Sequence, residues 1–160
     1  MIRKATVDDA AMIAKIYNYY VENTTITFEL EPVATHEMRG RIADISANYP
    51  YIVYEEDGKI VGYCYANLWK KKRAYHSTVE STVYIESSYQ QKGIGKKLMT
   101  RLIEELKNMQ THAIIACITI PNEKSVSLHE KLGFKQVSEF KEVGYKFDKW
   151  LDVGDWEMIF

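Results

Sequence analysis

The sequence has little cysteine, little proline and no long apolar run, and each scarcity excludes a class of protein. Its 160 residues include two cysteines and three prolines. Cys64 and Cys117 lie in apolar runs without a CxxC partner or nearby histidines, so we expect buried, inert thiols, no disulfide and no metal site. No window approaches the roughly 18 apolar residues of a membrane span. The N-terminal stretch lacks the apolar core of a signal peptide, so we expect a cytoplasmic protein.

The sequence also lacks an excess of charge of either sign. Lys and Arg total 21 against 22 Asp and Glu, which gives a formal net charge of −1. Such a balance provides no electrostatic reason to expect a nucleic-acid or membrane partner. A chain of this length can bury roughly 68–70% of its unfolded surface and needs no disulfide or metal for stability. We therefore expect a single domain over residues 1–160.

Apolar periodicity predicts an alternating succession of strands and helices, which is typical of a mixed α/β sheet. The predicted helices are 8–23, 35–48, 94–109 and 122–132. The predicted extended segments are 2–5, 24–28, 51–55, 59–68, 76–85, 112–119, 134–145 and 150–159. Side chains alternate along a strand, so Glu80, Thr82 and Tyr84 share one face of the strand at 76–85.

Residues 83–99 carry the clearest chemical signal. A strand is followed by a polar turn, and Gly93 and Gly95 lie where an amphipathic helix begins. The free amides and positive dipole of a helix start, together with glycines that let a ligand approach, predict a phosphate-binding turn. Neither a dinucleotide motif nor a P-loop fits, because Gln90 and Lys97 occupy the P-loop positions of glycine and Ser or Thr. A tight helix start without a ligand is the simpler alternative.

The spacing Gln90-x-x-Gly93-x-Gly95 after a strand resembles motif A of the GCN5-related N-acetyltransferase (GNAT) family, which binds the pyrophosphate of acetyl-CoA. Downstream, Asn122 with Ser125, Ser127, Leu128 and the run at 131–134 resembles the second cofactor motif of that family, and the order of elements agrees along the whole chain. Seven short motifs further resemble the phosphinothricin acetyltransferase branch: Thr27-Phe28, Trp69-Lys70, Ala74-Tyr75, residues 80–84, residues 120–122, His129-Glu130 and Val153-Gly154.

The resemblance implies the GNAT fold and acetyl-CoA as co-substrate, with no metal. This α/β (or α+β) fold has a central, mixed, mostly antiparallel twisted sheet with splayed middle strands, flanked by about four helices. The pantetheine arm of acetyl-CoA is implied to pair with the main chain of Val83, Tyr84 and Ile85 like an additional strand. The implied contacts of the pyrophosphate are Gln91, Lys92, Gly93, Ile94, Gly95 and Lys96. Asn122 is implied on the pantetheine side.

Glu80 is the residue that the resemblance implies as general base, with His129 as the second catalytic candidate. An amine that is mostly ammonium at neutral pH must lose a proton before it attacks the thioester. Imidazole exchanges protons near neutral pH, so His129 could act as acid or as base. From the residues alone, a solvent-exposed strand glutamate and a packing histidine are the alternatives.

Four successive cations at 70–73 stand between aromatic residues, which by itself is typical of a solvated turn. The resemblance implies that Lys70, Lys72 and Tyr75 surround an anionic acceptor. The implied pocket walls are Phe28, Tyr84, Thr119 and Val153. Together these residues indicate a small L-amino acid or analogue, such as phosphinothricin, methionine sulfoximine or methionine sulfone.

Two other functions stay open at this point. The chain could be a GNAT enzyme for a polyamine, an aminoglycoside or a protein N-terminus, or a non-catalytic acyl-CoA-binding sensor. The cationic run disfavours polycationic acceptors through like-charge repulsion, and the presence of Glu80 and His129 disfavours a sensor. The resemblance also implies a homodimer through the C-terminal strands, and the aromatic stretch at 150–160 is compatible with it.

Overall fold

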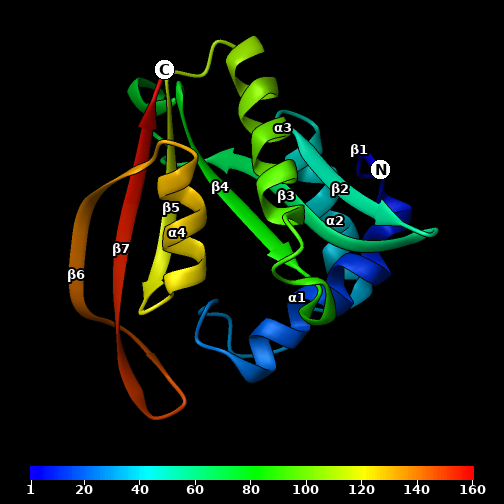
Figure 1. Cartoon of the computed structure of the whole chain (residues 1–160), viewed down its shortest axis with the longest axis horizontal. Helices are drawn as coiled ribbons and strands as arrows, with labels where there is room; N and C mark the ends of the chain where they lie inside the picture. The colour runs from blue at the N-terminus through cyan, green and yellow to red at the C-terminus, as the bar shows by residue number, and fades with distance from the viewer.

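The computed structural model describes all 160 residues, which form one seven-stranded sheet with helices on both faces (Figure 1). The strands are β1 (Ile2–Lys4), β2 (Tyr51–Glu56), β3 (Lys59–Leu68), β4 (Thr78–Ile85), β5 (Ala113–Ile120), β6 (Lys135–Lys146) and β7 (Lys149–Ile159). The helices are α1 (Ala10–Asn23), α2 (Thr35–Ser46), α3 (Ile94–Asn108) and α4 (Glu123–Lys131), with short 3-10 turns η1 (Val7–Asp9), η2 (Arg73–Tyr75) and η3 (Ser87–Tyr89). None of the helices combines the length and apolarity that crossing a membrane requires.

The strand order is β1-β2-β3-β4-β5-β7-β6, and every neighbouring pair is antiparallel except β4 with β5. The parallel pair is short, because Thr78, Val79 and Glu80 alone pair with Ala113, Ile114 and Ile115. Beyond these residues the two strands diverge (Figure 1). The mixed, mostly antiparallel sheet with splayed middle strands is therefore confirmed.

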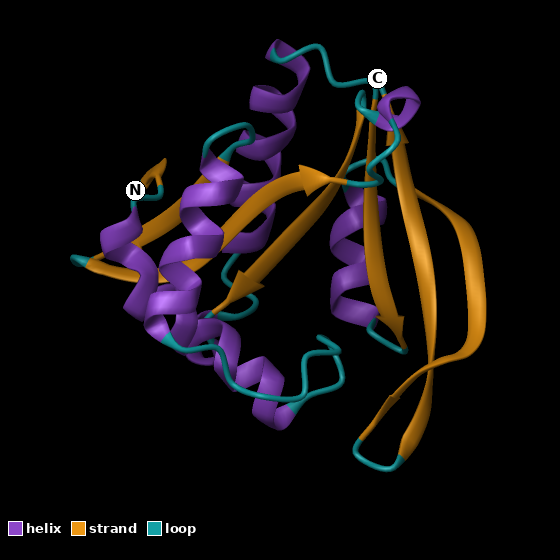
Figure 2. Ribbon diagram, turned by 180° about the vertical axis from the view of Figure 1, so that it is seen from behind, coloured by secondary structure: helices purple, strands orange, loops and turns teal.

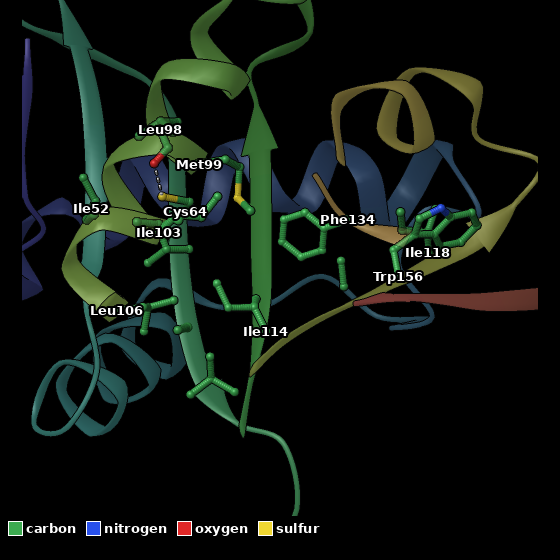
Figure 3. Close-up of a cluster of buried hydrophobic side chains, with 14 of the residues drawn as sticks. Ile52, Cys64, Leu98, Met99, Ile103, Leu106, Ile114, Ile118, Phe134 and Trp156 are labelled. Carbon is green, nitrogen blue, oxygen red and sulfur yellow. Dashed lines mark hydrogen bonds between the residues drawn. The ribbon is translucent and has the colours of Figure 1, made fainter. Parts of the chain in front are cut away.

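Helix α3 packs its apolar stripe against one face of the sheet. Leu98, Leu102 and Leu106 are fully buried, as their spacing of four residues predicts. They contact a core that includes Ile114 of β5, and Figure 3 shows Leu98, Leu106 and Ile114 within this cluster. Helix α4 packs at the edge of the same cluster. The α3–α4 face is thus the main hydrophobic core.

Helices α1 and α2 cover the opposite face, but only over β1 to β4. Ile13 and Ile16 of α1 and Met38 and Ile42 of α2 are buried there. Strands β5, β7 and β6 have no helix in front of them on this side (Figure 2). Cys117 of β5 lies on the same face of the sheet as Ile115, the residue that pairs with Glu80 of β4. The Cys117 side chain is exposed. The expectation that both cysteines are buried is correct for Cys64 and wrong for Cys117, because Cys117 faces a cavity beside β4.

The sequence predicted an extended segment at 24–28, and this prediction is wrong in part, because these residues form bends and join no strand. Polar side chains bind the backbone here instead of a neighbouring strand. The Thr24 hydroxyl donates to the Tyr20 carbonyl at 2.7 Å, and Lys146 donates to the Thr27 carbonyl at 2.9 Å. The other predicted elements are present, with ends that differ by one or two residues.

The packing of α3 leads to a stability prediction. Leu102→Ala should lower the free energy of unfolding by about 2–5 kcal/mol, because it removes buried methyl groups and leaves a cavity. The matched control is Met109→Ala, which follows α3 and is 48% exposed, and which should change stability by no more than about 0.5 kcal/mol. Urea denaturation measures both; equal losses for the two variants would contradict the described packing.

Candidate active site

The divergence of β4 from β5 leaves main-chain groups of β4 without a strand to bind. The Glu86 amide donates to the Val61 carbonyl of β3 at 2.8 Å. Hydrogen bonding alternates along an antiparallel pair, so the main chain of Tyr84 faces β3 and that of Val83 and Ile85 faces the gap. The Ile85 carbonyl already accepts a hydrogen bond from the Tyr20 hydroxyl. The remaining gap-facing groups are those that an extended ligand could bind.

A cavity of about 240 Å³ lies at this gap. It brings together eight residues that the sequence analysis proposed: Phe28, Glu80, Val83, Tyr84, Thr119, Asn122, His129 and Val153. It is also lined by residues to which the sequence analysis gave no role in the site: Ile26, Thr27, Ser81, Thr82, Ala116, Cys117, Ile118 and Ser125. Strand alternation could have found Thr82, Ser81 and Cys117, which share faces with proposed residues. Ser125 lies in the stretch that resembles the second cofactor motif, so it also had a local signal.

A larger cleft of about 600 Å³ lies between α4 and the strands β6 and β7. Its lining includes Glu123, Glu130 and Glu139, and it shares Asn122 with the smaller cavity. None of the other proposed residues reaches it. Size alone therefore does not identify the site, and the smaller cavity is the candidate because Glu80, His129 and most of the other proposed residues line it together.

Glu80 projects from β4 into the cavity and is half-buried. Burial raises the pKa of this carboxyl, and the negative charge of Asp155 raises it further. Asp155 lies on β7 opposite Cys117 of β5, and the Ser138 hydroxyl donates to its carboxylate at 2.8 Å. A carboxylate with a raised pKa in a cavity is suited to accept a proton close to neutral pH.

His129 projects from α4 into the same cavity and is almost completely buried. Its Nδ1 lies 2.7 Å from the Ser125 carbonyl. A carbonyl can only accept, so Nδ1 carries the proton and Nε2 has the free lone pair. Burial lowers the pKa of His129, and the bond to Ser125 opposes this in part. The imidazole is therefore neutral at neutral pH and able to accept a proton.

The turn between η3 and α3 has the geometry of an anion-binding site. Gly93 precedes α3 in a left-handed conformation, with φ of 78°. The first hydrogen bond of the helix runs from the Lys97 amide to the Gly93 carbonyl at 3.1 Å, so the amides of residues 94–96 have no acceptor within the protein. A Cβ on Gly95 would lie 3.3 Å from Leu128 Cδ2 of α4. Glycine at 95 thus allows α4 to approach the start of α3.

Two polar groups beside the gap have unused hydrogen-bonding capacity. The Ser81 hydroxyl is buried and has no partner within the protein. Asn122 is the N-cap of α4 and accepts from the Ser125 amide through Oδ1 at 3.2 Å, which leaves its Nδ2 group free. Both residues line the cavity. Their free groups are suited to the amides and carbonyls of an extended ligand.

The cationic run lies outside the cavity lining. Lys70 Nζ stands over the rings of Trp69, at 4.2 Å, and Tyr75, at 5.2 Å from the ring centroids. These two rings meet edge to face at 5.3 Å. Lys72 is exposed and directly precedes η2. The structure therefore places Lys70, Lys72 and Tyr75 together, but does not bring them to the other acceptor-site candidates.

Comparisons with known proteins agree with this geometry. Residues 2–154 match the family model described as an acetyltransferase (GNAT) domain. The chain is 38% identical over 159 residues to a phosphinothricin N-acetyltransferase of Streptomyces viridochromogenes, covering 99% of this chain and 87% of that protein. It is 36% identical over 156 residues to an L-methionine sulfoximine/L-methionine sulfone acetyltransferase of Salmonella typhimurium, covering 95% and 90%.

A solved structure with the same fold is a GNAT superfamily phosphinothricin acetyltransferase of Sinorhizobium meliloti in complex with acetyl-CoA. The TM-score is 0.96 at 33% identity, with 99% of this chain and 87% of that chain covered. The chain therefore belongs to the GNAT acetyltransferase family. It is an acyltransferase, as the sequence resemblance implied.

The position of Asp155 gives a testable prediction for Glu80. Asp155→Asn keeps an acceptor for the Ser138 hydroxyl but removes the negative charge, so the pKa of Glu80 should fall. Carbon-13 NMR titration of the Glu80 carboxyl measures this pKa. Asp152→Asn, on the other face of β7, is the matched control and should leave the pKa of Glu80 unchanged. An unchanged Glu80 pKa in Asp155→Asn would show that the two carboxylates do not interact.

Proposed function

We propose that the chain transfers the acetyl group of acetyl-CoA to the amino group of a small L-amino acid analogue of the phosphinothricin, methionine sulfoximine or methionine sulfone type. The observation that carries this proposal is the gap between β4 and β5, where Glu80, His129 and unpaired main chain line one cavity. The acceptor class rests on the names of the relatives, which cover most of the chain.

The residues around the gap fit acetyl-CoA. The free amides at the start of α3, from Ile94 to Lys96, and the turn residues Gln91, Lys92 and Gly93 would hold the pyrophosphate. The gap-facing main chain of Val83 and Ile85 would pair with the pantetheine arm, beside the unpartnered Ser81 hydroxyl and the free Asn122 amide. Tyr84 would contribute its side chain rather than its main chain, which faces β3.

Acetyl-CoA supplies an activated thioester carbonyl, so the protein needs no covalent intermediate. Glu80 would take the proton from the acceptor ammonium, directly or through water. The free amine would attack the carbonyl carbon, so that a C–N bond forms, the C–S bond breaks, and coenzyme A leaves as a thiolate that takes up a proton. Neutral His129, with a free lone pair on Nε2, would be a second proton acceptor. The Ile85 amide faces the gap and would stabilise negative charge that develops on the carbonyl oxygen.

The acceptor would lie between Phe28, Tyr84, Thr119 and Val153, which line the cavity. Lys70, Lys72 and Tyr75 would attract its acidic group from outside the cavity. Lysine lacks the bidentate fork of arginine, so the grip on a phosphinate or carboxylate would be weaker than an arginine would give.

We further propose that residues 1–160 act as one catalytic domain and that the enzyme is a cytoplasmic homodimer. The C-terminal strands support the dimer. β6 is exposed along nearly all of its length, and it is an edge strand of the sheet. Large apolar side chains are exposed on β6, at the β6–β7 turn and at the start of β7: Val137, Phe140, Val143, Tyr145, Phe147 and Trp150. Such a surface is typical of a protein interface.

A thiol-release assay with acetyl-CoA tests the function across phosphinothricin, methionine sulfoximine, methionine sulfone, ordinary amino acids, spermidine and an aminoglycoside. We expect the highest kcat/KM for the amino acid analogues. Glu80→Gln should lower turnover at neutral pH by about 100-fold or more, with partial recovery at high pH where the free amine is abundant. Glu157→Gln on β7, outside the cavity, is the control. Preference for spermidine, or full activity of Glu80→Gln, would contradict the proposal.

Gly93→Val tests the anion-binding turn. A β-branched residue is strongly disfavoured at φ of 78°, so the turn should rearrange and acetyl-CoA affinity should be lost. Gly40→Ala on α2, where an added Cβ meets nothing within 4 Å, should bind acetyl-CoA as the unaltered protein does. Calorimetry measures both affinities. Normal affinity in Gly93→Val would remove this turn from the acetyl-CoA site.

A further inference from the structure

Lys146, the last residue of β6, is a buried lysine that the proposed mechanism does not use. Its side chain is 2% exposed. Its Nζ donates to the Thr27 carbonyl at 2.9 Å and stands 5.1 Å from the centroid of the Phe147 ring. It forms no ion pair, although Glu29 is close enough to oppose the lowering of the Lys146 pKa by burial. Burying an ammonium group without a partner is costly, so the bond to the Thr27 carbonyl offsets part of that cost and would be expensive to break.

Strand β6 also contacts Phe28, the residue that follows Thr27. A Cβ on Gly144 would lie 2.3 Å from Phe28 Cε2, so the bare backbone of β6 touches the Phe28 ring. Only glycine leaves room for the ring in this position. Lys146 therefore fixes Thr27 through the Thr27 carbonyl, and Gly144 fixes Phe28 through contact with the Phe28 ring.

Residues 24–34 between α1 and α2 contain no helix or strand. Their shape therefore depends on contacts made by side chains. The Thr27 hydroxyl lies 2.7 Å from the Tyr17 hydroxyl, and the Tyr17 ring meets the Tyr84 ring at 5.3 Å. Thr27, Phe28 and Tyr84 all line the cavity. A displacement at Thr27 would thus change the acceptor side of the cavity.

We infer that Lys146 and Gly144 are positioning residues, which hold Thr27 and Phe28 in place and so set the shape of the acceptor pocket. The inference rests on the proposed function for the identity of the pocket. The acetyl-CoA turn at the start of α3 has no contact with these residues. The two substrates should therefore respond differently to changes in the β6–β7 hairpin.

Lys146→Met tests this inference, because it keeps most of the apolar stem and removes the donor. We expect the KM for the acceptor to rise about tenfold or more, while the KM for acetyl-CoA stays within about twofold. Hydrogen exchange followed by mass spectrometry should show faster exchange at residues 24–30. Lys149→Met, an exposed lysine on the same hairpin, is the matched control and should show neither change.

A second pair of variants covers the case in which Lys146→Met does not fold. Gly144→Ala should push the Phe28 ring aside and raise the acceptor KM. The same substitution in a Phe28→Ala background should add no further increase, because the ring that it displaces is gone. Additive effects of the two substitutions would overturn the contact between Gly144 and Phe28.

The inference is overturned if exchange at residues 24–30 and the acceptor KM are the same in Lys146→Met and Lys149→Met. It is also overturned if the KM values for acceptor and acetyl-CoA rise together. If the unaltered protein acetylates no amine in the panel, the proposed function fails instead. The exchange experiment still decides in that case whether Lys146 holds the segment.

Discussion

The short parallel pairing of β4 with β5 is the constraint on which the site depends. After Glu80 the strands separate, and the main-chain groups of Val83 and the amide of Ile85 have no partner strand, while the Ile85 carbonyl binds the Tyr20 hydroxyl. Unsatisfied backbone groups are costly unless a ligand or water binds them. The separation also joins the two faces of the sheet, so that Glu80 from β4 and His129 from α4 line one cavity. A closed sheet would keep these two groups on opposite sides.

Burial acts on the two titratable groups in opposite directions and brings them closer in acidity. It raises the pKa of Glu80 and lowers the pKa of His129. A carboxyl and an imidazole in water differ by about two pKa units, and the cavity reduces that difference. Burial thus favours the neutral form of both groups, which makes the Glu80 carboxylate more basic than it is in water and keeps the His129 imidazole uncharged.

Much of this site could be predicted from the sequence where the signal is local. The glycine spacing at 93 and 95 marked the start of α3, and strand alternation placed Glu80 and Tyr84 on one face. The threonines of residues 24–28 favour a strand, so the sequence predicts an extended segment there. The bent geometry depends instead on the hydrogen bond from Lys146, 119 residues away from Thr27. The exposure of Cys117 could not be predicted either, because it depends on the cavity that forms where β4 diverges from β5. Long-range contacts of this kind leave no periodic pattern.

The location of Cys117 has a consequence for the chemistry that the enzyme tolerates. Its thiol lines the acceptor cavity, and burial together with the charges of Asp155 and Glu80 raises its pKa to about 12. Peroxides and alkylating agents react with thiolates, and at neutral pH this sulfur is almost entirely protonated. The negative charges of Glu80 and Asp155 thus also lower the reactivity of the neighbouring sulfur toward electrophiles.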